Sequence, residues 1–346
     1  VMLPLVVFAR RNLPRFSSRA KDVAMMAVVL AVHLGFTRAG LYVADAIAEQ
    51  TGLPAVAIYA LAPLAAGAMV VRILTTSSNA LVYALVYGAL AGVVFRFDVA
   101  FMLMALLVGI AGSALVQTAQ SRTDILRGGL GTGALALGIA LATAVLQGVS
   151  SVQDSLWFAA GAASSGLGTA LFVFALLPFI ESTFRYTTPM KLMELANLNH
   201  PALKELILKA PGSYHHSMMV GQLVEAACEA VGADALLGRV GSYFHDIGKT
   251  RNPGYFAENQ QGVNPHDRLR PHMSALVIKA HVKDGVELAR QYGLPPEIIA
   301  FVTEHHGTSL IAYFHRRAME QADGAEVSEL EFRYPGPKPQ TRETAI

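Results

Sequence analysis

The sequence predicts an all-α protein: a polytopic transmembrane helix bundle followed by a cytoplasmic, all-helical domain. The chain is 53% hydrophobic and only 15% charged, whereas soluble domains carry about 25% charged residues. Residues 23–180 are nearly free of charge, and residues 181–346 have an ordinary soluble composition. Apolar residues in the second part recur at helical spacing, with no convincing strand alternation. One part is therefore expected in lipid and the other in water.

The first part contains six apolar segments that are expected to cross a bilayer, which takes about 20 residues. The stub at residues 1–9 is apolar but too short to cross, and we interpret it as the last turns of a helix whose start is missing. The bundle, with this truncated first helix, is therefore assigned to residues 1–180. The six segments lie at 23–44, 54–73, 79–95, 97–118, 128–147 and 156–180.

Basic residues in the short loops predict the orientation of the bundle. The opposite loops contain four acidic residues (Asp45, Glu49, Asp98 and Asp154), with Arg96 as the single basic residue. This bias places the first loop, and everything after residue 181, in the cytoplasm. The basic residues on the first loop's side are Arg10, Arg11, Arg15, Arg19, Lys21, Arg72, Arg122, Arg127, Arg185 and Lys191.

The bulk numbers exclude some classes of protein. The net charge of +2 is too small to suggest a DNA or RNA polymer as a partner. The single cysteine, Cys228, excludes an internal disulfide framework and is interpreted as a small side chain packed within a helix. His33 and Arg38 lie in an apolar segment and are functional candidates by default, although Arg38 can simply extend to the outer interface. No paired carboxylates mark an ion path, so a transporter is weakly supported.

Residues 181–212 are expected to form a helical connector, with helices that begin near Pro189 and Pro201. This segment can transmit a signal from the membrane or act as a plain rigid connector. The cytoplasmic domain is then assigned to residues 213–346. Within it, residues 250–272 are expected as a long polar loop, and the proline-rich stretch 334–339 cannot be helical.

Ten of the eleven histidines lie between His200 and His315, and several of them stand at predicted helix ends. His245 and Asp246, His281, and His305 with His306 are each expected at the end of a helix, and His216 just before one. Histidine and aspartate are good ligands for Mn, Fe or Zn. Helices that offer such residues to one point build dinuclear sites, and two cations favour hydrolysis of a phosphate ester.

The metal-ligand interpretation is strongest for His245, Asp246, His281, His305 and His306 taken together. The remaining histidines of this region are assigned lesser roles or left open: His215 as an outer neighbour, His272 either way, and His200, His266 and His315 at the surface or capping helices. Lys249 follows the His-Asp pair and is expected to neutralise a phosphate oxygen, the alternative being the solvated end of a helix.

The motif at residues 245–249, His-Asp-Ile-Gly-Lys, resembles the HD-domain metal-dependent phosphohydrolases. More closely, the chain resembles the seven-transmembrane receptors with an intracellular HD hydrolase. Residues 211–217, 258–260, 264–267 and 332–340 also match that family. The resemblance covers the membrane part and the cytoplasmic part, which is nearly the whole chain.

The resemblance implies a phosphodiesterase of a bacterial inner membrane that hydrolyses cyclic-di-AMP to pApA, with two metal ions, Mn or Fe. By motif position, one metal takes His216, His245 and Asp246. The other shares Asp246 and takes His281, His305 and His306. Asp246 and Lys249 are the expected catalytic residues. The family also has an extracellular sensor domain and a further aspartate ligand after the proline-rich stretch; because the sequence as given shows neither, weaker binding of the first metal is expected.

Two alternatives stay open beside this function. A cyclic-di-GMP phosphodiesterase of the HD type carries Gly-Tyr-Pro shortly after His-His-Glu, whereas residues 305–308 read His-His-Gly-Thr and residues 333–335 read Arg-Tyr-Pro. A receptor would hold the cyclic dinucleotide without turnover. The membrane part is expected to sense or transmit a signal, and a homo-oligomer is left open.

Overall fold

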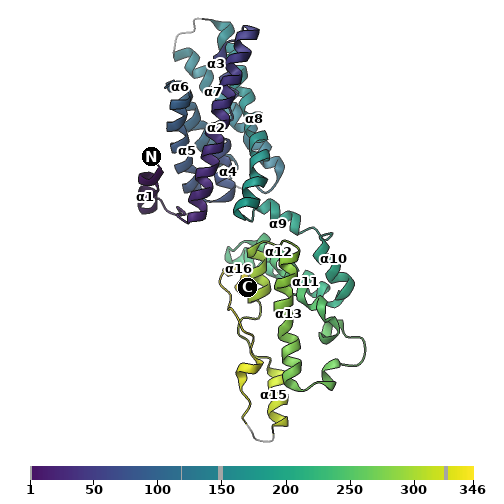
Figure 1. Ribbon diagram of the computed structural model, residues 1–346. Helices are drawn as coiled ribbons and strands as arrows, with labels where there is room; N and C mark the ends of the chain where they lie inside the picture. The colour runs from purple at the N-terminus through teal and green to yellow at the C-terminus, as the bar shows by residue number, and fades with distance from the viewer. Residues whose placement is uncertain (1, 118, 147–150, 323–325) are drawn as a thin grey trace. The chain divides into compact units, whose positions relative to one another are not determined.

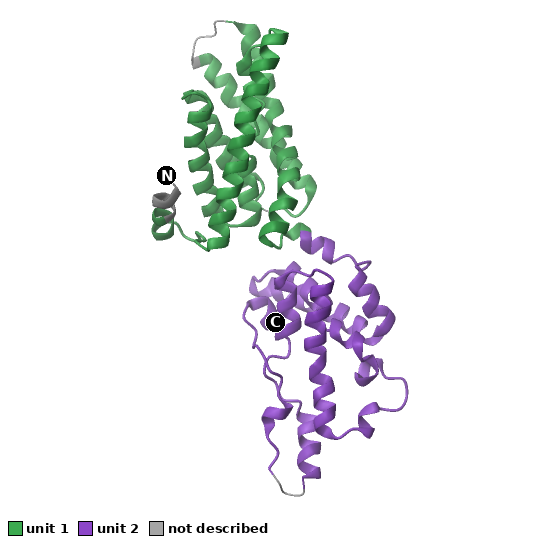
Figure 2. Ribbon diagram, in the orientation of Figure 1, with its two compact units in different colours: residues 1–190 green, residues 191–346 purple. Residues whose placement is uncertain are grey.

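The computed structural model describes residues 2–117, 119–146, 151–322 and 326–346 (Figure 1). Within these ranges the regular structure is helical, and the β-type pairing is one isolated bridge between Leu310 and Arg333. The chain divides into two compact units, residues 1–190 and 191–346 (Figure 2). The prediction of an all-α protein is confirmed.

The first unit contains long apolar helices, and four of them (α2, α5, α7 and α8) are long and apolar enough to cross a membrane. Helix α6 is also apolar but has only 17 residues. The protein is therefore a polytopic membrane protein. The helices of this unit are α1 (Met2–Asn12), α2 (Ala20–Thr51), α3 (Ala55–Tyr59), α4 (Ala66–Leu74), α5 (Ser77–Val94), α6 (Val99–Leu115), α7 (Arg122–Leu146) and α8 (Val152–Phe184).

The prediction of one continuous helix over residues 54–73 is wrong, because this segment forms α3 and α4 with a break between them. Pro63 lies in the break and has no N–H to offer to a helix. Its carbonyl oxygen accepts from the N–H of Ala66 at 3.0 Å and from Nε2 of buried His33 at 2.9 Å. The other ring nitrogen, Nδ1, then accepts from the hydroxyl of Tyr83 at 3.1 Å. Non-helical backbone at membrane depth needs such partners inside the protein.

The outer surface of the first unit is apolar, as expected for a protein whose solvent is lipid. Large side chains such as Phe36, Leu103 and Leu171 are exposed, whereas Thr37 and Asn79 are buried. Arg38 is exposed and lies over the ring of Tyr42, 4.5 Å from its centroid. This agrees with the interpretation that Arg38 extends to the outer interface.

Helices α7 and α8 pack with their backbones close together, as the small residues around 161–166 predict. A Cβ atom on Gly133 would lie 2.4 Å from the carbonyl oxygen of Ala163, and one on Gly166 would lie 2.4 Å from that of Gly129. Only glycine permits this distance. Close approach through small residues is a common way to associate helices in lipid.

The second unit packs its helices around one apolar core that includes Leu203, Val240, Phe244, Leu288 and Val302. Proline stands at or next to the first position of several of its helices, where its missing N–H costs little. Most of the segment 250–272 is a series of short 3₁₀ turns, and α13 begins within it at Pro271. The elements are α9 (Pro189–Leu195), α10 (Pro201–Lys209), α11 (Pro211–Val231), α12 (Ala235–Phe244), η1 (Ile247–Arg251), η2 (Pro253–Tyr255), η3 (Ala257–Asn259), η4 (Pro265–Arg268), α13 (Pro271–Gln291), α14 (Pro296–Glu304), α15 (Ala312–Gln321), η5 (Glu329–Phe332) and α16 (Arg342–Ala345).

Candidate metal centre

Asp246 lies where helix α12 gives way to the 3₁₀ turn η1. Phe244 and Ile247 flank the His245-Asp246 pair and are fully buried in the core. Their burial holds the backbone of the pair in place. Gly248 lets η1 approach helix α13, because a Cβ atom there would lie 1.8 Å from the carbonyl oxygen of His281. The local sequence therefore places a carboxylate directly against the helix that carries His281.

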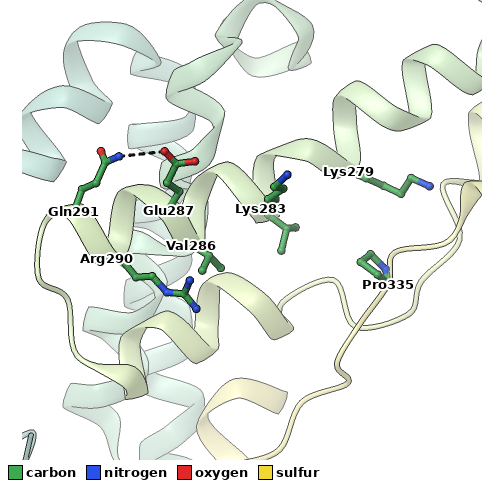
Figure 3. Close-up of a pocket in the computed structure, with 8 residues that line it drawn as sticks. Lys279, Lys283, Val286, Glu287, Arg290, Gln291 and Pro335 are labelled. Carbon is green, nitrogen blue, oxygen red and sulfur yellow. Dashed lines mark hydrogen bonds between the residues drawn. The ribbon is translucent and has the colours of Figure 1, made fainter.

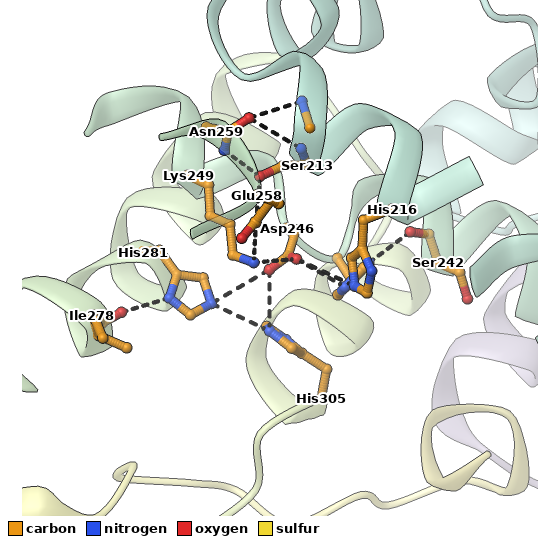
Figure 4. Close-up of polar contacts among 12 residues, drawn as sticks. Ser213, His216, Ser242, Asp246, Lys249, Glu258, Asn259, Ile278, His281 and His305 are labelled. Atoms are coloured by element: carbon orange, nitrogen blue, oxygen red, sulfur yellow. Dashed lines mark hydrogen bonds and ion pairs between the residues drawn. The ribbon is translucent and has the colours of Figure 1, made fainter. Parts of the chain in front are cut away.

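Four imidazoles surround the Asp246 carboxylate, two on each oxygen (Figure 4). The Nε2 atoms of His245 and His216 lie 3.1 Å and 3.8 Å from Oδ2. The Nε2 atoms of His281 and His305 each lie 3.6 Å from Oδ1. One carboxylate thus connects two groups of histidines that come from different helices.

Backbone carbonyls of the preceding helical turns orient three of these rings. Nδ1 of His245 donates to Ser242 O at 2.7 Å, and Nδ1 of His281 donates to Ile278 O at 2.5 Å. Nδ1 of His305 lies 3.1 Å from the carbonyl oxygens of both Phe301 and Val302. Because a carbonyl can only accept, a proton resides on Nδ1, and in the neutral ring this leaves the Nε2 lone pair available to a metal.

The donor atoms form two candidate metal groups: His216, His245 and Asp246 in one, and His281, His305 and His306 in the other. Within each group one ligand atom per residue lies within 4.8 Å of the others. Asp246 Oδ1 is buried and has no hydrogen-bond partner, although it faces the second group. A buried carboxylate oxygen without a donor is costly, and a cation between these groups would satisfy it. The residues present therefore fit divalent metal ions.

The charges of the cluster suit metal binding. Burial alone would raise the pKa of Asp246, but His245, His305 and Lys249 outweigh it and hold that pKa well below its usual range. Burial would lower the pKa of His245, and the Asp246 carboxylate outweighs this and raises it. Burial lowers the pKa of His281 to about 4 and that of His306 to about 3. The ionised Asp246 carboxylate and the neutral imidazoles of His281 and His306 are the protonation states that metal ligands need, whereas a protonated His245 would release its proton on binding a cation.

Lys249 lies one turn after Asp246 and is largely buried beside it. Its Nζ donates to Asp246 Oδ2 at 2.8 Å and to Glu258 Oε1 at 2.8 Å, and it lies 5.0 Å from the ring centroid of Phe256. Burial would lower the pKa of Lys249, but the two carboxylates outweigh it and raise that pKa. The ammonium group is therefore charged at neutral pH and close enough to the cluster to meet a phosphate oxygen.

His306 completes the second group and packs on a residue of the proline-rich stretch. Its ring lies 4.1 Å from that of His305 and stacks on Tyr334 at 4.1 Å with an interplanar angle of 17°. Gly307 follows with φ +51°, a left-handed conformation that turns the chain after helix α14. The segment 334–339 is non-helical, as predicted, and Tyr334 brings it against the cluster.

The structure brings together all six residues that the motifs select as metal ligands, but it corrects two local predictions. His281 was expected at a helix end, whereas it lies in the middle of α13. His216 lies inside α11 instead of before it. His245 and His305 stand directly after the last residues of α12 and α14, as predicted. Helix ends are weakly marked in sequence because tertiary contacts extend or shorten them.

The other histidines lie outside the cluster. His200 caps α10, accepting from the N–H of Ala202, so its capping role is confirmed. His266 and His315 are buried, so the expectation of a surface or capping position is wrong for them; each contacts a backbone carbonyl instead. His272 pairs with exposed Glu331 at 3.0 Å. His215 is exposed.

Several residues around the cluster were not given a role from sequence. Glu258 and Asn259 match a family motif, yet only the fold shows that they reach the first turn of α11 through Ser213. Glu304, buried just before His305, accepts from the N–H of Gln340 at 2.9 Å and from Thr344 Oγ1 at 2.7 Å. Acidic residues of this kind look like ordinary surface positions in sequence.

A separate cavity of about 700 Å³ lies along helix α13 (Figure 3). Lys279, Lys283 and Arg290 give its wall a positive charge, and Val282 and Val286 form an apolar floor. Its lining includes none of the six cluster residues. The chemistry is therefore placed at the cluster, where ligand atoms converge, and not at this cavity.

The fold and the site together define a class: polytopic membrane proteins that carry a helical metal-binding domain built on a His-Asp centre. The chain belongs to the family of 7TM receptors with an intracellular HD hydrolase, whose profile matches residues 1–188. An HD domain matches residues 213–345. The family predicted from the motifs is thus confirmed, and with the HD domain comes a dependence on divalent metal ions.

Two curated relatives are similar to most of the chain. One is the cyclic-di-AMP phosphodiesterase PgpH of Bacillus subtilis (strain 168), 38% identical over 295 residues, which are 83% of this chain and 41% of that protein. The other is the cyclic-di-AMP phosphodiesterase PgpH of Listeria monocytogenes serotype 1/2a (strain 10403S), 39% identical over 288 residues, or 82% of this chain and 40% of that protein. The chain thus spans about two fifths of the length of these relatives.

Among solved structures, the chain is similar to the crystal structure of the L. monocytogenes phosphodiesterase PgpH HD domain in complex with cyclic-di-AMP. The sequence identity is 53%, and the match covers 43% of this chain and 69% of that chain with a TM-score of 0.41.

Proposed function

We propose that this protein is a metal-dependent phosphodiesterase that hydrolyses cyclic-di-AMP to pApA. The observation that carries the proposal is the position of the Asp246 carboxylate. Each of its two oxygens faces a group of imidazoles, and Oδ1 is buried without a hydrogen-bond partner. The substrate class rests on the similarity to the two PgpH proteins. A cyclic dinucleotide is therefore the proposed small-molecule partner, and no nucleic-acid polymer is.

Two metal ions are proposed, with Mn or Fe as the ions expected from the family. His216, His245 and Asp246 would hold one, and Asp246, His281, His305 and His306 would hold the other. When bound, two such cations supply Lewis acidity toward a phosphate ester. The protein's own contribution is orientation, because the carbonyls behind His245, His281 and His305 keep each Nε2 directed at the shared carboxylate.

Lys249 is proposed as the residue that meets the phosphate. Its ammonium group is charged at neutral pH, and it lies 2.8 Å from Asp246 Oδ2, on the side of the first group. A phosphate oxygen brought to this point would gain a charge-assisted hydrogen bond. Lys249 would thereby lower the cost of negative charge on the ester, while Asp246 keeps the two groups of histidines at a constant separation.

The domain organisation is part of the proposal. Residues 1–180 would form the bundle in a bacterial inner membrane, residues 181–212 the connector, and residues 213–346 the HD domain on the cytoplasmic side. The loop charges support this orientation. The bundle would sense or transmit a signal to the HD domain.

The experiment that tests the proposal uses the 346-residue chain purified in detergent with Mn²⁺. Cyclic-di-AMP, cyclic-di-GMP and a generic phosphodiester are supplied in parallel. Conversion of cyclic-di-AMP to pApA, abolished by His245→Ala and Asp246→Ala, is the expected result. His272→Ala is the matched control, because this histidine pairs with Glu331 outside the cluster. Preference for cyclic-di-GMP, or tight binding of cyclic-di-AMP without turnover at any metal concentration, would contradict the proposal.

A further inference from the structure

The ammonium group of Lys249 has two carboxylate partners, and only one of them belongs to the metal cluster. Asp246 is the carboxylate that would bind a cation, and a bound cation repels a neighbouring ammonium group. Glu258 lies outside both metal groups and accepts from the same Nζ at 2.8 Å (Figure 4). Glu258 is thus the anchor that remains for Lys249 once Asp246 binds metal.

Glu258 is itself held by helix α11. Ser213 Oγ donates to Glu258 Oε1 at 2.7 Å, and Asn259 Nδ2 donates to Ser213 Oγ at 2.8 Å. Ser213 is fully buried, whereas Glu258 keeps part of its surface in solvent. The carboxylate of Glu258 therefore has a fixed position on the rim of the cluster instead of moving freely with its loop.

Asn259 caps the same helix from a distance in sequence. Its Oδ1 accepts from the backbone N–H groups of Gly212 at 2.8 Å and Ser213 at 3.2 Å. These N–H groups belong to the first turn of α11, where a helix has no partners of its own. The two segments lie so close that a Cβ atom on Gly212 would be 1.9 Å from Glu258 O. The turn η3 is therefore seated directly on the start of α11.

His216 depends on this seat more than the other cluster residues do. It follows Gly212 and Ser213 by about one helical turn, so that its position is set by the start of α11. Its side chain is 49% exposed, against 10% for His245 and 2% for His281. Packing therefore holds His216 least, and the capped backbone has to hold it instead.

We propose that Glu258 and Asn259 are positioning residues of the metal centre: Glu258 holds Lys249 where it meets the phosphate, and Asn259 holds the helical turn that presents His216 to the metal. The two residues have separable consequences. Loss of Glu258 should impair the handling of substrate and leave metal affinity near that of the wild type. Loss of Asn259 should weaken metal binding.

The first test uses Glu258→Gln in the full chain, assayed for Mn²⁺ affinity by calorimetry and for kcat and KM with cyclic-di-AMP; this arm rests on the proposed function. We expect kcat/KM to fall about 10-fold or more, with Mn²⁺ affinity within about twofold of the wild type. In the Lys249→Met background the same substitution should cause no further loss. Glu287→Gln is the matched control. The carboxylate of Glu287 lies outside the cluster and pairs with Arg251 at an N–O distance of 3.7 Å.

The second test uses Mn²⁺ alone and needs no turnover. Asn259→Ala should weaken Mn²⁺ binding about 10-fold or more, and Asn259→Asp should restore it, because the acceptor for the Gly212 N–H is kept. Asn264→Ala is the matched control, since Asn264 caps another turn of the same loop through the His266 N–H. Rescue by Asn259→Asp also separates a lost cap from a misfolded domain.

The outcomes distinguish this inference from the proposed function. A wild-type chain that hydrolyses no cyclic dinucleotide would end the proposed function, and the Mn²⁺ affinities of the Asn259 variants would then decide the inference alone. Wild-type kcat/KM in Glu258→Gln, an additive loss with Lys249→Met, or wild-type Mn²⁺ affinity in Asn259→Ala would overturn it.

Discussion

Asp246 has a different role from the histidines around it, because its two oxygens face separate groups. Oδ2 lies 3.1 Å from His245 Nε2, while Oδ1 lies 3.6 Å from the Nε2 atoms of His281 and His305. Loss of one histidine would leave the other group complete. Loss of the carboxylate would remove the connection between the two groups.

We therefore expect Asp246→Asn to weaken Mn²⁺ binding at least about 100-fold, since the loss of outer partners of metal ligands already costs 10- to 100-fold. The change keeps the size of the side chain and removes its charge. Calorimetric titration of the purified chain with Mn²⁺ measures it. Asp267→Asn is the control, because Asp267 is exposed and pairs with Arg317 outside the cluster. Equal affinities of the two variants would show that Asp246 does not bind metal.

The buried histidines also predict how the metal-free chain responds to acid. The pKa values of His281 and His306 are lowered to about 4 and about 3, from an ordinary value of 6.5. Below pH 6.5 the unfolded chain binds protons at these sites that the folded chain does not, so folding stability falls as pH falls. His245 acts in the opposite sense, because its raised pKa favours the folded state below pH 6.5; it offsets part of the effect.

The expected result is a lower midpoint of thermal unfolding for the HD domain at pH 5 than at pH 7, measured with metal removed by a chelator. His281→Gln should reduce this difference, because it removes one of the two histidines with the largest downward shifts. A midpoint that rises or stays constant between pH 7 and pH 5 would contradict the assignment of neutral, buried imidazoles.

At the scale of elements, backbone contact governs the packing of the membrane unit. Helices α7 and α8 meet at Gly133 and Gly166, where any side chain would collide with a carbonyl group of the other helix. In the break between α3 and α4, Pro63 O accepts from the N–H of Ala66 and from the buried side chain of His33. The hydrogen bonds to Pro63 O meet the membrane's requirement that backbone polar groups be paired inside the protein, and the glycines allow the close helix packing that is common in lipid.

Gly133→Val is expected to destabilise the α7–α8 pair by about 1–3 kcal/mol or more, because the added methyl groups must push the helices apart. Gly138→Val on the same helix is the matched control, since its Cβ atom meets nothing within 4 Å. Unfolding of both variants in mixed micelles, followed by circular dichroism, gives the comparison. Similar midpoints would mean that the close approach at Gly133 contributes little.

At the scale of the whole molecule, the chain joins a bundle with an apolar exterior to a helical unit with an ordinary polar surface. The orientation proposed from the loop charges is testable without any assay of activity. It requires only that residues on alternate loops be accessible from opposite sides of the membrane.

Single cysteines at Ser121 and Gln153, introduced in a Cys228→Ala background, should report opposite sides. Both positions are exposed. Ser121 directly precedes helix α7, and Gln153 lies in the first turn of helix α8. In intact cells we expect a membrane-impermeant thiol reagent to label Gln153→Cys and to leave Ser121→Cys unlabelled until the cells are broken. Labelling in the reverse pattern would place the HD domain outside the cytoplasm.

The sequence by itself determined the all-α class, the membrane part, the family and the identity of the residues that gather at the cluster. Hydropathy and motifs such as residues 245–249 are local signals, readable without knowing what lies nearby in space. Only the tertiary structure decided that the two oxygens of Asp246 face two groups of histidines, and that His33 donates to the carbonyl of Pro63 at a helix break. It also decided that Glu258 contacts Lys249 and that Asn259 caps the start of α11. These contacts join residues far apart in the chain, and their energies depend on distance and burial, which no local pattern records.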